Sequence, residues 1–145
     1  MRQKLQDLHE ALARKGLRST RQREVVYRVV ARAKDHPTAE EIFSRCRVAM
    51  PTISIATVYN CLETLADCGL VRQVNFERES SRYEPALVPH AHFFCDETGV
   101  VTDVELPNKV LEALKGLVPE PFFVSEVELN FRGTQSKQSP GVAAK

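Results

Sequence analysis

The sequence predicts an α+β protein, with an N-terminal winged helix-turn-helix domain followed by a small α/β domain. Two observations lead to this prediction. Residues 1–70 carry apolar side chains at helical spacing behind Ser and Thr helix caps, and residues 71–83 then alternate as two short strands. After Pro85 the pattern changes to strands around a single helix.

Two helices open the chain. Residues 3–15 place leucine and alanine side chains on one stripe, and Gly16 follows where a left-handed residue can end the helix. Thr20 can cap the second helix, whose valine face continues to Val30 and which stops before Pro37. The polar sides of both helices are rich in arginine and lysine.

Two further helices follow. Thr38 and Glu41 form a capping-box pattern, in which each side chain bonds the other's backbone amide, and this pattern starts a short third helix. Ser54 caps the fourth helix, which Gly69 closes. The apolar seam of the fourth helix consists of Val58, Leu62 and Leu65. The side chains expected to face outward are Thr57, Tyr59, Asn60 and Glu63.

The basic charge of the first part predicts a polyanionic partner. Residues 1–34 hold ten Lys or Arg side chains against three acidic ones, a net charge of +7, whereas residues 86–145 carry −3. Helices followed by a two-stranded ribbon are typical of modules whose last helix enters the DNA major groove. The residues expected to contact double-stranded operator DNA are Lys15, Arg18, Arg23, Ser54, Thr57, Tyr59 and Asn60. The charge pattern alone also fits a solvated helix surface.

The second half is expected to be a dimerisation domain. The expected strands span residues 92–95, 100–105 and 122–131. Pro107 starts a helix whose inward side chains are Val110, Leu111, Leu114 and Leu117. Three strands and one helix leave apolar surface and strand edge uncovered, so a homodimer through this half is predicted. The expected domains are residues 1–84 and 85–133, with a disordered tail over residues 134–145.

His90 and His92 are the first candidate metal ligands. They stand two residues apart in a β-prone run, so their side chains point to the same face of a strand. One ion can take both rings if other ligands converge on them. An isolated His-x-His pair also occurs by coincidence.

The cysteines and the lengths of the apolar runs indicate where in the cell the protein is expected to be. None of the four cysteines forms a C-x-x-C pair, which argues against a disulfide framework and an all-cysteine zinc site and favours a reducing, cytoplasmic location. No run approaches 18 apolar residues, and the first residues do not read as an export signal. No membrane association is expected.

Six motifs occur in a fixed order along most of the chain. They are Leu17-Arg18-x-Thr20-x-Gln22-Arg23, His36-Pro37-Thr38-Ala39-Glu40-Glu41, Ile53-Ser54-x-Ala56-Thr57-Val58-Tyr59, Gly69-Leu70-Val71, Arg82-Tyr83-Glu84 and His90-x-His92. Together with Asp103 they resemble the ferric uptake regulator family of metal-responsive transcriptional repressors. Within that family, Tyr59-Asn60 and residues 80–83 are most similar to the peroxide-sensing branch.

The resemblance implies a regulatory metal site. Its five ligands would be His36, Glu84, His90, His92 and Asp103. Three imidazoles and two carboxylates suit Fe(II) or Mn(II), and Zn(II) in vitro, and no thiolate is present to favour a softer ion. An ion bound by all five would hold the two halves in one orientation and would raise operator affinity by linkage.

The resemblance further implies peroxide sensing. Fe(II) can reduce hydrogen peroxide, and oxidation of His36 or His90 would then destroy the site and release DNA. In the family, an aspartate at the position of Asp103 accompanies this behaviour. The alternative is an iron, or other divalent metal, uptake regulator that responds to metal occupancy alone, because Glu84 is more typical of the iron sensors.

The chain departs from the family in its cysteines. Most members hold the second half with a zinc bound by two C-x-x-C pairs, whereas here only Cys95 remains and Thr98 replaces its partner. No four-cysteine structural zinc is therefore expected. Cys46, Cys61 and Cys68 are interpreted as small buried residues, and Cys95 could instead serve as a thiol redox sensor.

Two other classes of function compete with a repressor. The sequence shows no nucleophile–base arrangement, glycine-rich phosphate loop or H-E-x-x-H helix, so an enzyme is not expected. A metallohydrolase that uses the same histidines and carboxylates is one alternative. A metal-storage or interaction protein that never contacts DNA is the other.

Overall fold

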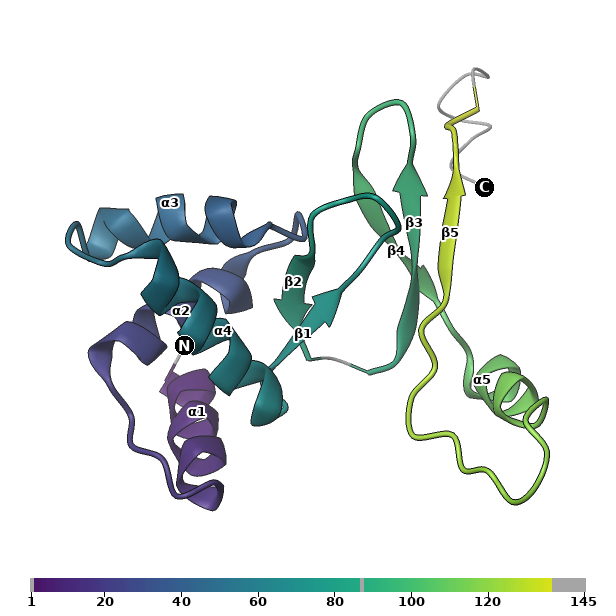
Figure 1. Ribbon diagram of the computed structural model, residues 1–145, viewed down its shortest axis with the longest axis horizontal. Coiled ribbons are helices and arrows are strands. Elements are labelled where there is room, and N and C mark those ends of the chain that lie inside the picture. Colours follow the sequence, from purple (N-terminus) through teal and green to yellow (C-terminus); the bar gives the residue numbers. More distant parts are fainter. Residues whose placement is uncertain (1, 87, 137–145) are drawn as a thin grey trace. The chain divides into compact units, whose positions relative to one another are not determined.

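The computed structural model describes residues 2–86 and 88–136. The chain divides into two compact units, Met1–Leu87 and Val88–Lys145. Helices and small sheets occur in both units, and the predicted α+β class is confirmed (Figure 1).

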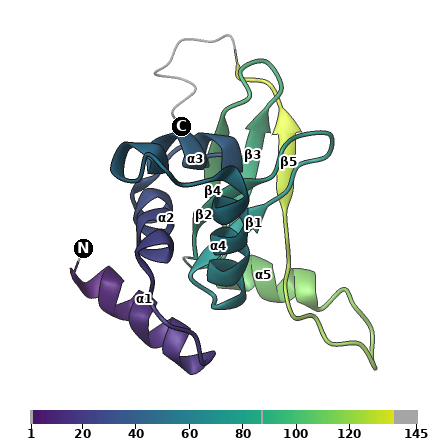
Figure 2. The ribbon, with the colours of Figure 1, turned by 60° about the vertical axis from the view of Figure 1, so that its left-hand side comes forward.

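The first unit combines four helices with a two-stranded ribbon. Its elements are α1 (Arg2–Arg14), α2 (Arg21–Arg32), α3 (Ala39–Ala49), α4 (Ile55–Asp67), β1 (Val71–Val74) and β2 (Arg82–Pro85). Helices α2, α3 and α4 group together, and the antiparallel pair β1–β2 lies beside them (Figures 1 and 2). This is the order of elements expected for a winged helix-turn-helix domain.

The predicted helix caps are confirmed. Thr20, Thr38 and Ser54 each accept a hydrogen bond from the backbone amide three residues further on, at 3.2, 3.3 and 3.1 Å. The Glu41 carboxylate accepts a hydrogen bond from the Thr38 amide and completes the capping box of α3. These caps satisfy amides that the first helical turn leaves unpaired, and they fix where each helix begins.

One apolar core holds the first unit together. Its fully buried side chains include Leu8, Leu12, Val26, Val30, Ile42, Val58, Leu62 and Leu65. The predicted seam of α4 is therefore confirmed. Cys46 and Cys61 are buried as expected, whereas Cys68 is only partly buried. Each large aliphatic side chain contributes roughly 1.5–3 kcal/mol when it is buried, so this packing fixes α4 against α2 and α3.

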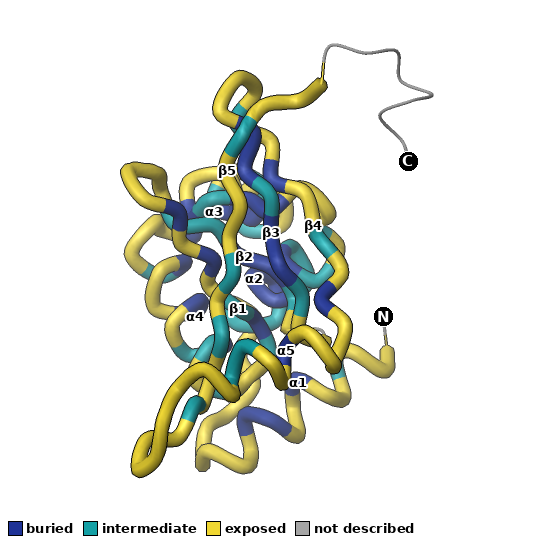
Figure 3. The backbone as a smooth tube through the Cα atoms, turned by 90° about the vertical axis from the view of Figure 1, so that its right-hand side faces the viewer, coloured by how far each residue is buried: buried dark blue, intermediate teal, exposed yellow. Residues whose placement is uncertain are grey.

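The second unit is a three-stranded sheet with one helix. Its elements are β3 (His90–Cys95), β4 (Val101–Glu105), α5 (Asn108–Lys115) and β5 (Asn130–Gly133). Strand β3 lies between β4 and β5, as Figure 3 shows. It is antiparallel to β4 and parallel to β5. The buried apolar side chains of this unit include Ala91, Phe94, Cys95, Val101, Leu106 and Leu111.

The predicted strand over residues 122–131 is wrong for most of its length. Only Asn130 and Phe131 of that range belong to β5, and residues 122–129 form no strand. Phe123 is 99% exposed and Phe122 is 69% exposed, within the largely exposed segment that precedes β5 (Figure 3). Alternating side chains form a strand when a neighbouring strand pairs with them, and within the described residues β5 pairs with β3 alone.

Helix α5 is also less buried than the sequence pattern predicts. Leu111 is buried, but Val110 is 45% exposed and Leu117 is 77% exposed. Leu117 lies beyond the end of α5 at Lys115.

Several expectations about domains stay predictions. They include the boundary after residue 84 and the roles given to the two halves. The disordered tail predicted for residues 134–145 lies outside the described residues from residue 137 onward. In the part of the chain that the structure describes, no helix is long and apolar enough to cross a membrane.

Candidate metal centre and DNA-contact surface

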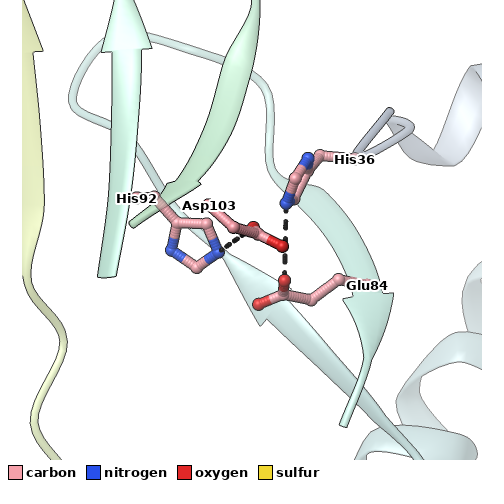
Figure 4. A group of neighbouring side chains, drawn as sticks. All are labelled: His36, Glu84, His92 and Asp103. Carbon is pink, nitrogen blue, oxygen red and sulfur yellow. Dashed lines mark ion pairs between the residues drawn. The ribbon is translucent and has the colours of Figure 1, made fainter. Parts of the chain in front are cut away.

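The first half-site consists of His36 and Glu84, both in the first unit. Nε2 of His36 lies 3.4 Å from Oε2 of Glu84, and both side chains are buried. Figure 4 draws this ion pair. An imidazole nitrogen and a carboxylate oxygen at this separation can both reach one divalent cation.

The backbone around His36 is fixed against β2, the strand that carries Glu84. The Arg82 guanidinium donates a hydrogen bond to the His36 carbonyl at 3.1 Å, and the Tyr83 amide donates to the Pro37 carbonyl at 2.9 Å. His36 has a φ of 52°, in the left-handed region that costs a residue with a Cβ about 1 kcal/mol or more. These hydrogen bonds to β2 help to hold the His36 ring in place next to Glu84.

The second half-site consists of His90, His92 and Asp103, all in the second unit. Oδ1 of Asp103 lies 3.4 Å from Nε2 of His90 and 3.6 Å from Nε2 of His92. Figure 4 draws the pair His92–Asp103. The centroids of the two imidazole rings are 4.6 Å apart, as expected for two residues on one face of a strand.

Sheet register explains the second half-site. His92 on β3 is the direct partner of Asp103 on β4, and His90 lies two residues earlier on the same face. Nδ1 of His90 lies 3.0 Å from the Val88 carbonyl, and because a carbonyl can only accept, Nδ1 donates this hydrogen bond. The other ring nitrogen, Nε2, faces Asp103. A backbone partner of this kind orients a metal-binding histidine.

The donor atoms of both half-sites fit a divalent metal ion. Together the half-sites offer three imidazole nitrogens and two carboxylates, and neither contains a thiolate. Nitrogen and oxygen donors of this kind suit Fe(II), Mn(II) and Zn(II). All five predicted ligands therefore belong to one or the other half-site.

Cys95 lies on β3 with its side chain buried. A hydrogen bond with the Thr98 side chain, the residue that replaces the second cysteine of a C-x-x-C pair, lowers the pKa of the Cys95 thiol. Burial limits its access to oxidants. A redox role for Cys95 stays a prediction.

The predicted DNA-contact residues lie on α2, α4 and the segments that precede them. Arg23, Thr57 and Asn60 line one polar hollow of about 220 Å³, which is formed by the start of α2 and by residues 57–64 of α4. The Arg23 guanidinium donates a hydrogen bond to the Arg18 carbonyl at 2.7 Å and thereby ties the α1–α2 connection to α2. Lys15 is exposed in that connection.

Two residues that the sequence did not single out contribute to these surfaces. The Tyr59 hydroxyl donates a hydrogen bond to Glu40 on α3 at 2.9 Å, and Arg82 holds the loop of His36. Both residues stand within the motifs quoted from the sequence, but neither was assigned a role there. No local pattern marks either residue, because both contacts join segments that are distant in the sequence.

A winged helix-turn-helix unit, followed by a unit that carries histidine and carboxylate ligands, defines a metal-responsive transcriptional regulator. The sequence model described as the ferric uptake regulator family matches residues 14–131, and the chain belongs to this family. Over 104 residues it is 33% identical to the peroxide-responsive repressor PerR of Staphylococcus aureus, a match that covers 72% of this chain and 70% of PerR.

Solved structures agree with this assignment. A zinc-bound manganese uptake regulator is 29% identical, with a TM-score of 0.66 over 88% of this chain and 97% of that one. The ferric uptake regulator of Pseudomonas aeruginosa with manganese is 26% identical, with a TM-score of 0.71 over 87% and 96% of the two chains. Regulators of this family bind operator DNA and function as dimers, and they are not enzymes, so the prediction of a non-enzymatic function is confirmed.

Proposed function

We propose that this regulator is a metal-dependent, DNA-binding repressor that senses peroxide through Fe(II)-catalysed oxidation of a histidine ligand. The observation that carries the proposal is that each unit presents its own half-site of imidazole and carboxylate groups. The similarity to a peroxide-responsive repressor supports the finer assignment.

The two half-sites would bind one ion between them. His36 and Glu84 supply two ligands, and His90, His92 and Asp103 supply three, so neither half-site alone completes the five or six positions that Fe(II) or Mn(II) prefers. Because the ligands come from both units, a shared ion favours one arrangement of the units over all others.

This arrangement would control DNA binding through a homodimer. A dimer presents two copies of α4, and both can enter successive major grooves only when they are about 34 Å apart. Metal binding that favours this spacing raises operator affinity, and operator binding raises metal affinity by the same factor. The DNA would contact Lys15, Arg18, Arg23, Ser54, Thr57, Tyr59 and Asn60.

Peroxide would end repression by removing a ligand. Fe(II), when bound, would supply the redox chemistry that activates hydrogen peroxide, with the imidazole as the group that is finally oxidised, whereas Mn(II) in the same site is not readily oxidised. The net change is that an imidazole of His36 or His90 gains one oxygen atom and the peroxide leaves as water. The oxidised ring no longer offers the same nitrogen donor, so the ion is lost and the operator is released.

A second function is favoured by one residue. Glu84 in the first half-site is the ligand that the resemblance associates with iron sensors. Under that function the chain is a regulator of iron, or other divalent metal, uptake that responds to metal occupancy alone.

One experiment separates the two functions. Operator binding is measured with dimer loaded with Fe(II) or Mn(II), before and after a low dose of hydrogen peroxide, together with peptide masses that cover His36 and His90. Peroxide sensing predicts that the Fe(II) form alone loses DNA and gains one oxygen on a histidine. If both forms keep DNA and no histidine changes mass, metal occupancy is the signal. If neither form binds a duplex with steep salt dependence, the repressor function itself is wrong.

A further inference from the structure

The Tyr59 side chain is held by a neighbouring helix. Tyr59 lies on α4, is 45% exposed, and donates its hydroxyl hydrogen to the Glu40 carboxylate of α3 at 2.9 Å. Both residues belong to the first unit, so this contact does not depend on how the two units are arranged. The hydrogen bond fixes the direction in which the phenol oxygen presents its lone pairs.

The direction of this hydrogen bond follows from the chemistry of the two groups. An ionised carboxylate can only accept hydrogen bonds, and a phenol has a single hydrogen to donate. The hydrogen of Tyr59 is therefore used within the protein, and the oxygen is left as an acceptor. The same hydrogen bond raises the pKa of Tyr59, so the phenol keeps its proton at neutral pH.

Capping does not account for the position of Glu40. The first turn of α3 already has a complete capping box from Thr38 and Glu41. An additional carboxylate beside an exposed α4 residue repels DNA phosphates and weakens binding to every sequence alike. Such a cost is offset where the carboxylate improves discrimination between sequences.

We propose that Glu40 is a specificity-determining residue, which makes Tyr59 read an amino group on a base edge in the major groove. This inference rests on the proposed operator binding by α4. In the major groove the amino donors are N6 of adenine and N4 of cytosine, whereas thymine O4 and guanine O6 and N7 are acceptors. A tyrosine whose hydrogen is held by Glu40 pairs with the donors and is rejected by the acceptors.

The test is selection from a randomised duplex library with metal-loaded dimer. Wild type is compared with Tyr59→Phe, which removes the hydroxyl, and with Glu40→Ala, which frees its hydrogen. Glu63→Ala is the matched control, because Glu63 lies one turn further along α4 and its removal deletes the same charge. Circular dichroism and thermal melting show whether each variant is folded.

At the base position where Tyr59→Phe changes the preference, wild type and Glu63→Ala should favour adenine or cytosine by about tenfold. Glu40→Ala should lose this preference and accept thymine or guanine at the same position. Wild type should also bind about tenfold more weakly when that adenine is replaced by purine, or that cytosine by pyrimidin-2-one, since neither analogue carries the amino group. The analogue measurement needs no variant protein.

Three results would overturn the inference. Glu40→Ala could select the same bases as Glu63→Ala, or the analogues could bind wild type as tightly as the natural bases; either result leaves operator binding intact and removes the role of Glu40. If the library yields no enriched duplex, the proposed DNA binding fails, and the inference fails with it.

Discussion

Nε2 of His36 lies 3.4 Å from Oε2 of Glu84, although one residue belongs to the loop before α3 and the other to β2. The pair depends on hydrogen bonds from β2 to this loop, in particular the one that the Arg82 guanidinium donates to the His36 carbonyl. The first half-site is therefore a product of the tertiary fold of the first unit. Its geometry should be sensitive to residues that do not bind the metal.

Arg82→Ala should weaken metal binding without removing a ligand. Loss of the hydrogen bond to the His36 carbonyl lets the strained loop relax away from Glu84, and loss of such an orienting partner typically costs about 10- to 100-fold in metal affinity. Titration with Mn(II) measures this change. Arg78→Ala, in the exposed turn between β1 and β2, is the control and should keep wild-type affinity. Equal affinities of the two variants would show that Arg82 does not position His36.

Asp103→Glu should separate metal binding from histidine oxidation. The Asp103 carboxylate lies within 3.4 and 3.6 Å of both imidazoles of β3, and one added methylene moves it relative to them. We expect Mn(II)-dependent DNA binding to be retained and the yield of oxidised His36 and His90 in the Fe(II) form to fall. Intact mass after a fixed peroxide dose reports the yield. An unchanged yield would show that the aspartate does not set peroxide reactivity.

Phe123→Glu should weaken the proposed homodimer. Phe123 is 99% exposed, and it lies in the segment 122–131, whose alternating pattern predicts a strand that pairs with another strand. A carboxylate that replaces an aromatic side chain within an interface typically weakens association by about 30-fold or more. Sedimentation equilibrium measures the dimer constant. Val48→Glu, at an apolar residue of the first unit that is 87% exposed, is the control. If both variants dimerise like the wild type, the dimer forms through another surface.

Cys46 should make the protein less stable at high pH. Burial raises the pKa of the Cys46 thiol from 9.0 to about 11. Between these values the unfolded chain loses the thiol proton while the folded chain keeps it, so unfolding is favoured as pH rises from 9 to 11. At pH 10.5 this contribution reaches about 2 kcal/mol.

Urea unfolding at pH 7 and pH 10.5 tests this contribution. Between pH 7 and pH 10.5, the free energy of unfolding of Cys46→Ala should fall by about 2 kcal/mol less than that of the wild type. Titrations of Lys and Tyr are common to both proteins and cancel in this comparison. The variant itself is expected to be less stable at pH 7, since it leaves a small cavity. Equal losses in both proteins would contradict the buried-thiol assignment.

The sequence predicted those features that depend on local pattern. The caps Thr20, Thr38 and Ser54 and the seam Val58, Leu62 and Leu65 follow from short-range periodicity, and all are confirmed. His90 and His92 share a face because strand side chains alternate. The five proposed metal ligands were assigned through motif resemblance, which carries long-range information that spacing lacks.

Other features could not be predicted from local pattern. Residues 122–129 alternate like a strand, but alternation does not specify which strand will pair with them, and they form no strand in a single chain. Glu40 and Arg82 act through contacts with Tyr59 and His36, each formed only when distant segments pack together. Composition and periodicity do not predict contacts between residues that are distant in the sequence.

The most direct test of the proposed shared metal site is to measure the stoichiometry and affinity of Mn(II) binding. The proteins compared are wild type, His36→Ala and His92→Ala. His9→Ala is the control, because His9 is an exposed α1 histidine paired with Glu24. The account predicts one ion per chain, with affinity reduced at least about 100-fold by loss of either ligand and unchanged by loss of His9. If His36→Ala leaves the second half-site binding Mn(II) at wild-type affinity, each unit holds its own ion, and metal binding cannot couple the two units.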